Sequence, residues 1–256
     1  MTNDPLQQLR DRADESVVLL DFDGTISRIV ENPADARPVG GVVGTLESLR
    51  GAYLDVAVIS GRPLSFLTDM LPDDLTVAGL YGLEGREHGR EWVHPNSGAW
   101  REVMADIAAG SSANGPEGML TELKGLSITL HYRAHPELVD EVMEFAQSQA
   151  GRAGLEIRPA RMSVELHPPI EIDKGTIVER LAADATGALF IGDDVGDLTA
   201  FNALDRLSAI GVTTVKVAVA GDEAPPGLTD SADLVVDGPD AVVALLSSLL
   251  PVSPRR

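Results

Sequence analysis

The chain has 256 residues, of which 40 are acidic and 20 are basic, and its formal net charge is −20. This acidity argues against a nucleic-acid-binding protein, which needs a basic surface, and against attraction to an anionic membrane. The absence of cysteine excludes disulfides, zinc–thiolate sites and thiol catalysis. The sequence has neither a recognisable signal peptide nor a membrane-spanning stretch, and we therefore expect a cytoplasmic protein.

Short apolar runs alternate with segments of helical periodicity along most of the chain. Continuous apolar runs are typical of parallel strands that are covered on both faces. Strands are predicted at residues 17–20, 56–59, 77–80, 188–191 and 215–219. Helices are predicted at residues 42–49, 64–71, 175–185 and 198–207. This alternation predicts an α/β fold with a Rossmann-like parallel sheet at its core.

The pattern changes between about residue 100 and residue 170. Residues 127–133 and 161–167 alternate strictly between polar and apolar side chains, as antiparallel strands with one buried face do. Their polar faces, which include Arg133, Arg161 and Glu165, are either solvated or available to cover a ligand. We therefore expect an inserted α+β domain at residues 101–170, within a core domain formed by residues 1–100 and 171–256.

Clustered carboxylates follow two of the predicted parallel strands. Asp21 and Asp23 come directly after the first strand, and Thr25 adds a hydroxyl group that an anion can bind. A second acidic group follows the strand at 188–191. Because ligands bind at the carboxyl ends of strands in an open α/β sheet, both groups lie where a site is expected. A hard divalent cation such as Mg²⁺ would relieve the repulsion between the two groups of carboxylates. Either motif alone could instead be an ordinary polar turn. The second group contains Asp193, Asp194 and Asp197.

Two further strand ends carry cationic or hydroxyl side chains. Ser60, Gly61 and Arg62 follow the second strand and offer a hydroxyl, a flexible backbone and a cation. Lys174 opens the helix that precedes the strand at 188–191. A lysine at a helix N-terminus is electrostatically unfavourable unless it reaches an anion, so we expect one nearby; a plain exposed lysine is the alternative.

Taken in order along the chain, these four motifs resemble those of the haloacid-dehalogenase-type phosphatase superfamily. Within that superfamily, the sequence is similar to the trehalose-6-phosphate phosphatases. This second similarity rests on residues 124–127, 131–133, 161–165 and 173–175. The resemblance implies that the inserted domain is a cap domain, and that the protein is a phosphoric monoester hydrolase that uses Mg²⁺.

The resemblance also implies a role for each candidate residue. Asp21 would be the nucleophile and Asp23 the general acid and base, while Lys174 would stabilise negative charge. Phosphate would be bound by Thr25, Ser60, Gly61 and Arg62; a surface ion pair is the alternative role for Arg62. The metal would be held by Asp21, the backbone carbonyl of Asp23, and Asp193, while Asp194 and Asp197 would either be further ligands or orient the waters around the ion. The sugar would be contacted by Lys124, Arg133, Arg161, Glu165 and Glu84.

The expected partner is a small sugar phosphate, trehalose 6-phosphate, and we expect a monomer that binds neither nucleic acid nor membrane. The same motifs suit a phosphatase for another sugar phosphate, such as sucrose phosphate or a glucosyl-phosphoglycerate, because they contact only the phosphate. Gly196 and Leu198 stand where the family has threonine and glutamate, which makes a catalytically inactive sugar-phosphate-binding regulator a second alternative. A phosphomutase is a third.

Overall fold

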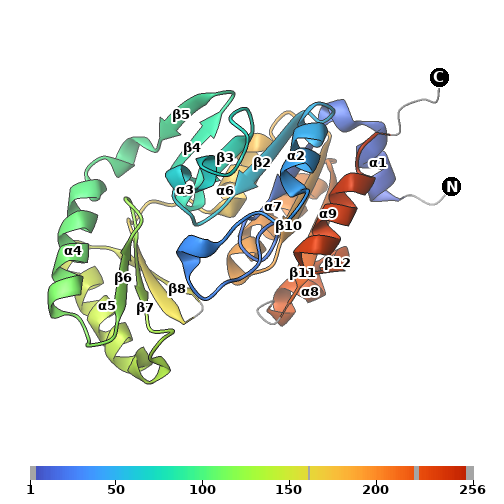
Figure 1. The fold of residues 1–256 in the computed structure, drawn as a ribbon. Coiled ribbons are helices and arrows are strands. Elements are labelled where there is room, and N and C mark those ends of the chain that lie inside the picture. The colour runs from blue at the N-terminus through green and yellow to red at the C-terminus, as the bar shows by residue number, and fades with distance from the viewer. Residues whose placement is uncertain (1–3, 161, 222–224, 252–256) are drawn as a thin grey trace. The chain divides into compact units, whose positions relative to one another are not determined.

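The structure is a computed structural model and describes residues 4–160, 162–221 and 225–251. These residues divide into two compact units. The core unit contains the described residues up to Trp92 and from Ile172 onward, and the inserted unit contains those between Val93 and Glu171. Figure 1 shows both units coloured along the chain. The interpretation of the inserted unit as a cap domain, and the expected domain boundaries, stay predictions.

Within the described residues, the core unit is built on an eight-stranded sheet with the strand order β12-β11-β10-β1-β2-β3-β4-β5. The pairs from β12 to β3 are parallel, and β4 lies antiparallel to β3. The predicted α/β fold with a parallel core sheet is therefore confirmed. The strands are β1 (Ser16–Leu20), β2 (Asp55–Ile59), β3 (Thr76–Gly79), β4 (Glu84–Glu87), β5 (Arg90–Val93), β10 (Gly187–Gly192), β11 (Thr213–Ala220) and β12 (Leu234–Asp237).

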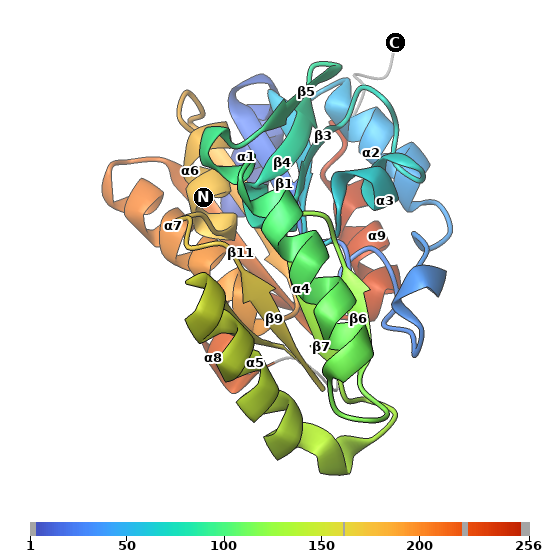
Figure 2. The ribbon, with the colours of Figure 1, turned by 90° about the vertical axis from the view of Figure 1, so that its left-hand side faces the viewer.

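Helices cover both faces of this sheet (Figure 2). On one face, Leu20 of β1 shares a buried cluster with Leu46 of α2 and Leu246 of α9. On the other face, the rings of Phe190 in β10 and Phe201 in α7 are 6.3 Å apart. Because both faces are covered, every residue of β1 is buried, and its sequence is apolar with almost no alternation. The helices of the core unit are α1 (Pro5–Asp11), α2 (Val42–Arg50), α3 (Leu64–Thr68), α6 (Lys174–Leu181), α7 (Leu198–Ala209), α8 (Pro226–Ser231) and α9 (Gly238–Ser248).

The inserted unit contains an antiparallel sheet with the strand order β6-β7-β9-β8. Apolar side chains from β7 and β9, such as Leu130 and Val164, form a buried cluster with Met104 of α4 and Val142 of α5. The elements are α4 (Trp100–Asn114), β6 (Leu120–Leu123), β7 (Ile128–His131), α5 (Val139–Ala153), β8 (Glu156–Ala160) and β9 (Ser163–His167). Across the stretches of chain that the structure describes, no helix combines the length and the apolar composition that crossing a membrane requires.

Candidate active site

The candidate site lies at the carboxyl ends of β1 and β10, two neighbouring strands in the middle of the core sheet. Their ladder pairs Leu20 with Ile191, and the N–H of Asp21 donates to the carbonyl of Ile191 at 2.9 Å. This additional hydrogen bond places Asp21 beside the segment that follows β10. The Asp21 side chain is buried. The two acidic motifs, which are about 170 residues apart in sequence, therefore meet at one edge of the sheet, as a parallel arrangement requires.

Lys174 is the first residue of α6 and lies buried between carboxylates. Its Nζ is 2.7 Å from Asp21 Oδ1 and 2.6 Å from Asp197 Oδ1. Asp173 caps the start of α6, so the helix begins at the lysine and not before it. A cation at a helix N-terminus is unfavourable, but here two buried carboxylates offset that cost. Lys174 is thus not an exposed lysine, which was the alternative interpretation of its sequence context.

Asp197 shapes the segment after β10, here called the carboxylate loop (residues 193–197). Its Oδ2 accepts the N–H of Asp193 at 2.9 Å and that of Asp194 at 3.0 Å. Asp21, Asp193 and Asp197 each place one oxygen within 4.8 Å of the others. Asp194 lies further out, with 56% of its side chain exposed and its Oδ1 4.0 Å from Lys174 Nζ. Three converging buried carboxylates form a donor set suited to a hard divalent cation.

The crowding of buried acids disfavours their ionised forms. Burial and the charges of Asp197 and Asp194 raise the pKa of Asp193 to about 8. Burial also raises the pKa of Asp197 to about 6, although the Lys174 ammonium opposes this. The pKa of Asp21 is raised well above its ordinary value, again chiefly by burial. For Lys174, burial favours the neutral amine, but the Asp197 and Asp21 carboxylates outweigh it and raise the lysine pKa well above its ordinary value. The single positive charge of Lys174 does not neutralise the negative charges that Asp21, Asp193 and Asp197 carry when they are ionised.

Gly24 allows the loop after β1 to approach Asp193 closely. Gly24 has a φ of +74°, and a Cβ atom at this position would lie 1.9 Å from Asp193 Oδ2. Any other residue would therefore combine a left-handed backbone with a collision against a carboxylate of the site. This geometry explains the glycine in the motif that follows Asp23.

Gly24→Ala is accordingly expected to bind a divalent cation such as Mg²⁺ much more weakly than the unsubstituted protein, because the added methyl group displaces Asp193. Gly41→Ala is a matched control, since Gly41 has a φ of +86° and a Cβ atom there would meet nothing within 4 Å. Each substitution should cost about 1–2 kcal/mol of stability from the left-handed backbone. Thermal melts and Mg²⁺ titration of both variants check this; equal Mg²⁺ affinity in the two would contradict it.

Two buried polar atoms at this site, Thr25 Oγ1 and Asp193 Oδ1, have no hydrogen-bond partner among the described residues. Such atoms are rare, because burying an unpaired polar group costs free energy. A phosphate and a metal ion are ligands that would satisfy a hydroxyl and a carboxylate oxygen at these places. Ser60 is also buried, at the end of β2, and its Oγ accepts the N–H of Arg62 at 3.2 Å.

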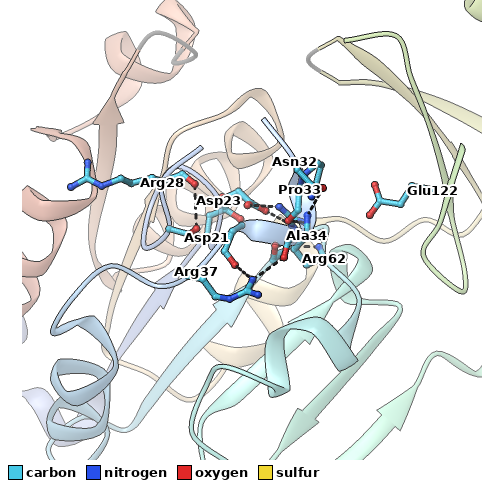
Figure 3. Close-up of polar contacts among 12 residues, drawn as sticks. Asp21, Asp23, Arg28, Asn32, Pro33, Ala34, Arg37, Arg62 and Glu122 are labelled. Carbon is cyan, nitrogen blue, oxygen red and sulfur yellow. Dashed lines mark hydrogen bonds and ion pairs between the residues drawn. The ribbon is translucent and has the colours of Figure 1, made fainter. Parts of the chain in front are cut away.

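Arg62 was predicted to contact phosphate, but in the structure it pairs with Asp23 (Figure 3). Its Nε donates to Asp23 Oδ2 at 2.6 Å, and its Nη2 donates to Asp23 Oδ1 at 2.7 Å. Its Nη1 donates to the carbonyl of Pro33 at 2.8 Å, in the loop between β1 and α2. This two-pronged pair orients the carboxylate of Asp23, and the contact between Arg62 and phosphate stays a prediction.

The loop at residues 60–62 is held by Leu80 and Tyr81, for which the sequence offered no signal. Both have positive φ angles, of 50° and 58°, which are uncommon for residues other than glycine. The N–H of Tyr81 donates to the carbonyl of Ser60, and the N–H of Leu80 donates to that of Arg62, each at 2.9 Å. A Cβ atom at position 61 would lie 2.6 Å from the tip of the Tyr81 ring, so Gly61 is required for this contact.

The remaining predicted site residues are those that we expect to contact the sugar. In the core unit, Glu84 Oε1 accepts the N–H of Leu64 at the start of α3, at 2.8 Å. In the inserted unit, Glu165 is buried in β9 opposite Thr129 of β7. Lys124, in the turn between β6 and β7, and Arg133, two residues after β7, are half-buried. Arg161 lies outside the described residues. Contact of these side chains with a sugar stays a prediction.

The comparisons with known proteins identify the family. The sequence matches the trehalose-phosphatase family over residues 19–230. The chain belongs to that family. It is 33% identical to the trehalose-phosphate phosphatase of Mycobacterium avium over 199 residues, which cover 73% of this chain and 51% of that protein. It is also 34% identical to an uncharacterized glycosyl hydrolase of Mycobacterium tuberculosis, over 76% of this chain and 16% of that protein.

Solved structures from the same group share the fold of this trehalose-phosphatase family member. The C-terminal domain of the trehalose-6-phosphate phosphatase of Candida albicans superposes with a TM-score of 0.78 and 22% identity, covering 98% of this chain and 97% of that one. A trehalose-6-phosphate phosphatase related protein superposes with a TM-score of 0.74, covering 91% and 96%. The chain spans about half the length of the mycobacterial trehalose-phosphate phosphatases that it matches.

Proposed function

We propose that this protein is a Mg²⁺-dependent phosphatase that hydrolyses trehalose 6-phosphate to trehalose and phosphate. The observation that carries the proposal is the buried ammonium of Lys174 between Asp21 and Asp197, with the unpaired Asp193 oxygen beside them. Such a group has the nucleophile, the cation and the metal-binding oxygens of a phosphoryl-transfer site. Membership of the trehalose-phosphatase family supports the choice of substrate.

The acidic residues fit a divalent cation well. Asp21, Asp193 and Asp197 would hold Mg²⁺, because their oxygens already converge. Their pKa values are raised first by burial and then by repulsion from neighbouring carboxylates, and a bound cation would relieve this repulsion. When bound, Mg²⁺ supplies positive charge that relieves the repulsion between these carboxylates and an incoming phosphate. Asp194 lies at the exposed edge of the group and would act through water.

Asp21 is the proposed nucleophile. One of its oxygens attacks phosphorus, a bond from Asp21 to phosphorus forms, and the bond from phosphorus to the sugar oxygen breaks. Lys174 stabilises the negative charge on Asp21 and on the transferring group. Thr25 and Ser60 donate hydrogen bonds to the phosphoryl oxygens, which would satisfy the buried Thr25 hydroxyl.

Asp23 is the proposed general acid and base. Its carboxyl group gives a proton to the departing sugar oxygen, and the resulting carboxylate then takes a proton from the water that attacks the aspartyl-phosphate. This second step breaks the bond between Asp21 and phosphorus and restores the free enzyme. Arg62 donates hydrogen bonds to both oxygens of Asp23. Asp23 must therefore exchange one of these hydrogen bonds for a contact with the leaving group during turnover.

The sugar is proposed to be recognised by the inserted unit. Glu165 can accept hydrogen bonds from paired sugar hydroxyls, while Lys124, Arg133 and Arg161 can donate to hydroxyls or to phosphate. The excess of cations among these four residues suits an anionic ligand despite the net charge of −20. As the core residues contact only phosphate, discrimination among sugar phosphates must come from residues of this kind.

A phosphate-release assay over several esters tests the proposed function. Trehalose 6-phosphate, sucrose 6-phosphate, glucosyl-phosphoglycerate and an aryl phosphate are compared with Mg²⁺ present. We expect kcat/KM for trehalose 6-phosphate to exceed the others by about 100-fold, which corresponds to two well-made polar contacts. Near-equal values would overturn the substrate assignment, and tight binding of an ester without phosphate release would favour a regulator.

Removal of Mg²⁺ is expected to make the stability of the protein depend on pH. Asp193 has a folded-state pKa of about 8, against about 3.9 in the unfolded chain. The folded state therefore holds a proton that the unfolded state releases, and stability falls as the pH rises through this window. Mg²⁺ binds the ionised carboxylates, so it should raise the melting temperature more at the upper end of the window than at the lower end.

Thermal melts with and without Mg²⁺ at several pH values between those limits measure this effect. Asp193→Asn serves as the control, because it should reduce both the loss of stability at high pH and the response to Mg²⁺. A Mg²⁺-induced shift of the same size at all pH values would show that the cation does not bind at these carboxylates.

A further inference from the structure

Two helices that carry the site begin side by side in the core unit. The starts of α6 and α7 lie next to each other, and the two helices pack together (Figure 2). Lys174 is the first residue of α6, and the carboxylate loop runs directly into α7. The hydrogen bond between Lys174 and Asp197 therefore depends on the position of one helix start relative to the other. Catalytic geometry of this kind must be held to within about 0.5 Å.

The hydroxyl of Thr199 joins these two helix starts. Its Oγ1 accepts the N–H of Gly175, the residue after Lys174, at 3.2 Å. The same Oγ1 donates to the carbonyl of Gly196, inside the carboxylate loop, at 3.0 Å. The first N–H groups of a helix lack partners within the helix, so this contact satisfies one of them from outside. Asp173 caps another, that of Thr176, from within the same segment.

The backbones also touch at this point. A Cβ atom at position 175 would lie 2.4 Å from the carbonyl oxygen of Thr199, which is a backbone atom that cannot move away cheaply. Gly175 therefore permits the two backbones to approach closely, and the hydrogen bonds of the Thr199 hydroxyl fix the position of one helix start relative to the other. The hydrogen bonds of the Thr199 hydroxyl go to backbone groups and not to the carboxylates or the ammonium, so it acts through the segments that it connects.

We propose that Thr199 is a positioning residue that fixes Lys174 relative to the carboxylate loop, an inference that rests on the proposed function. Loss of its hydroxyl frees the N–H of Gly175 and the carbonyl of Gly196 and lets the two helix starts shift. The affinity for Mg²⁺ and the turnover number should then fall together. The KM for a small ester should change little, because no group that touches substrate has been removed.

The test compares Thr199→Val, which keeps the shape and removes the hydroxyl, with Thr199→Ser, which keeps the hydroxyl. Thr45→Val is the matched control: Thr45 is half-buried in α2 and its Oγ1 donates to the carbonyl of Gly41 at 3.0 Å, remote from the site. Three quantities are measured for each protein: kcat and KM for an aryl phosphate, the Kd for Mg²⁺ by calorimetric titration, and the melting temperature.

We expect Thr199→Val to weaken Mg²⁺ binding and to lower kcat at least about tenfold, with KM within about twofold of wild type, because a misplacement of about 1 Å is enough to slow catalysis by about 100-fold. Thr199→Ser should stay close to wild type, and Thr45→Val should change only the melting temperature. Equal kcat and Mg²⁺ affinity in Thr199→Val and Thr45→Val, or a Thr199→Ser variant as poor as Thr199→Val, would overturn the proposal.

Two further outcomes are also decisive. If Thr199→Val does not fold, the result for Thr199→Ser decides. The proposal requires that this variant, which keeps the hydroxyl, has the kcat and the Mg²⁺ affinity of the wild-type protein, and lower values of both would overturn it. If the wild-type protein releases no phosphate from any ester, the proposed function fails. The calorimetric Kd values for Mg²⁺ still measure the positioning effect in that case.

Discussion

Asp21→Asn is expected to abolish phosphate release from every ester while leaving the protein folded. The amide cannot attack phosphorus as a carboxylate does, and loss of a covalent nucleophile lowers kcat on the order of 10⁴-fold or more. The fold should survive, because Lys174 retains Asp197 as a partner at 2.6 Å. Removal of the Asp21 carboxylate also relieves its repulsion with Asp197, Asp193 and Asp194.

Phosphate release and the melting temperature of Asp21→Asn are measured beside Asp240→Asn. Asp240 is exposed and forms an ion pair with Arg28 at the protein surface, so its substitution should affect neither quantity strongly. A folded Asp21→Asn variant that kept more than about a hundredth of the wild-type kcat would refute the assignment of the nucleophile.

Lys174→Met should have the largest effect on stability. The substitution leaves the carboxylates of Asp21 and Asp197 buried without their cation, although both are almost fully removed from solvent. Breaking a buried ion pair by deleting one partner typically costs about 3–5 kcal/mol. Activity should be lost as well, because nothing then stabilises the charge on the nucleophile. Urea unfolding without Mg²⁺, above the pKa of about 8 for Asp193, gives the clearest measurement.

A double variant separates these two consequences. Lys174→Met combined with Asp197→Asn removes one negative charge along with the positive one, so part of the lost stability should return. Activity should not return, because both the cation and a metal-binding oxygen are missing. If Lys174→Met alone were as stable as wild type, then the lysine would not compensate the buried acids as the distances indicate.

Much of the fold could be predicted from the sequence because its signals are local. The almost continuously apolar β1 predicted a strand covered on both faces, and its position before Asp21 placed the acidic motif at a strand end. Parallel strands bring their carboxyl ends to one edge, so the meeting of Asp21 with the carboxylate loop followed from the fold. The unfavourable position of Lys174 at a helix start likewise indicated a nearby anion.

Other parts of the site depend on contacts that cannot be predicted from the spacing of the residues along the sequence. The pairing of Arg62 with both oxygens of Asp23 and the contact of Glu84 with the start of α3 join residues whose separation is set by the packed structure. The positive φ angles of Leu80 and Tyr81 are stabilised by hydrogen bonds to the loop at residues 60–62, and neither residue type favours that conformation by itself. Such contacts arise from tertiary structure alone.

The decisive measurement for covalent catalysis by Asp21 is a rapid acid quench of the wild-type protein turning over trehalose 6-phosphate with a radiolabelled phosphoryl group. Acid preserves an aspartyl-phosphate long enough for peptide mapping. Nucleophilic attack by Asp21 predicts label on the peptide that contains this residue, dependent on Mg²⁺ and absent in Asp21→Asn. Release of labelled phosphate at the full steady-state rate, with no label on that peptide at any quench time, would contradict it.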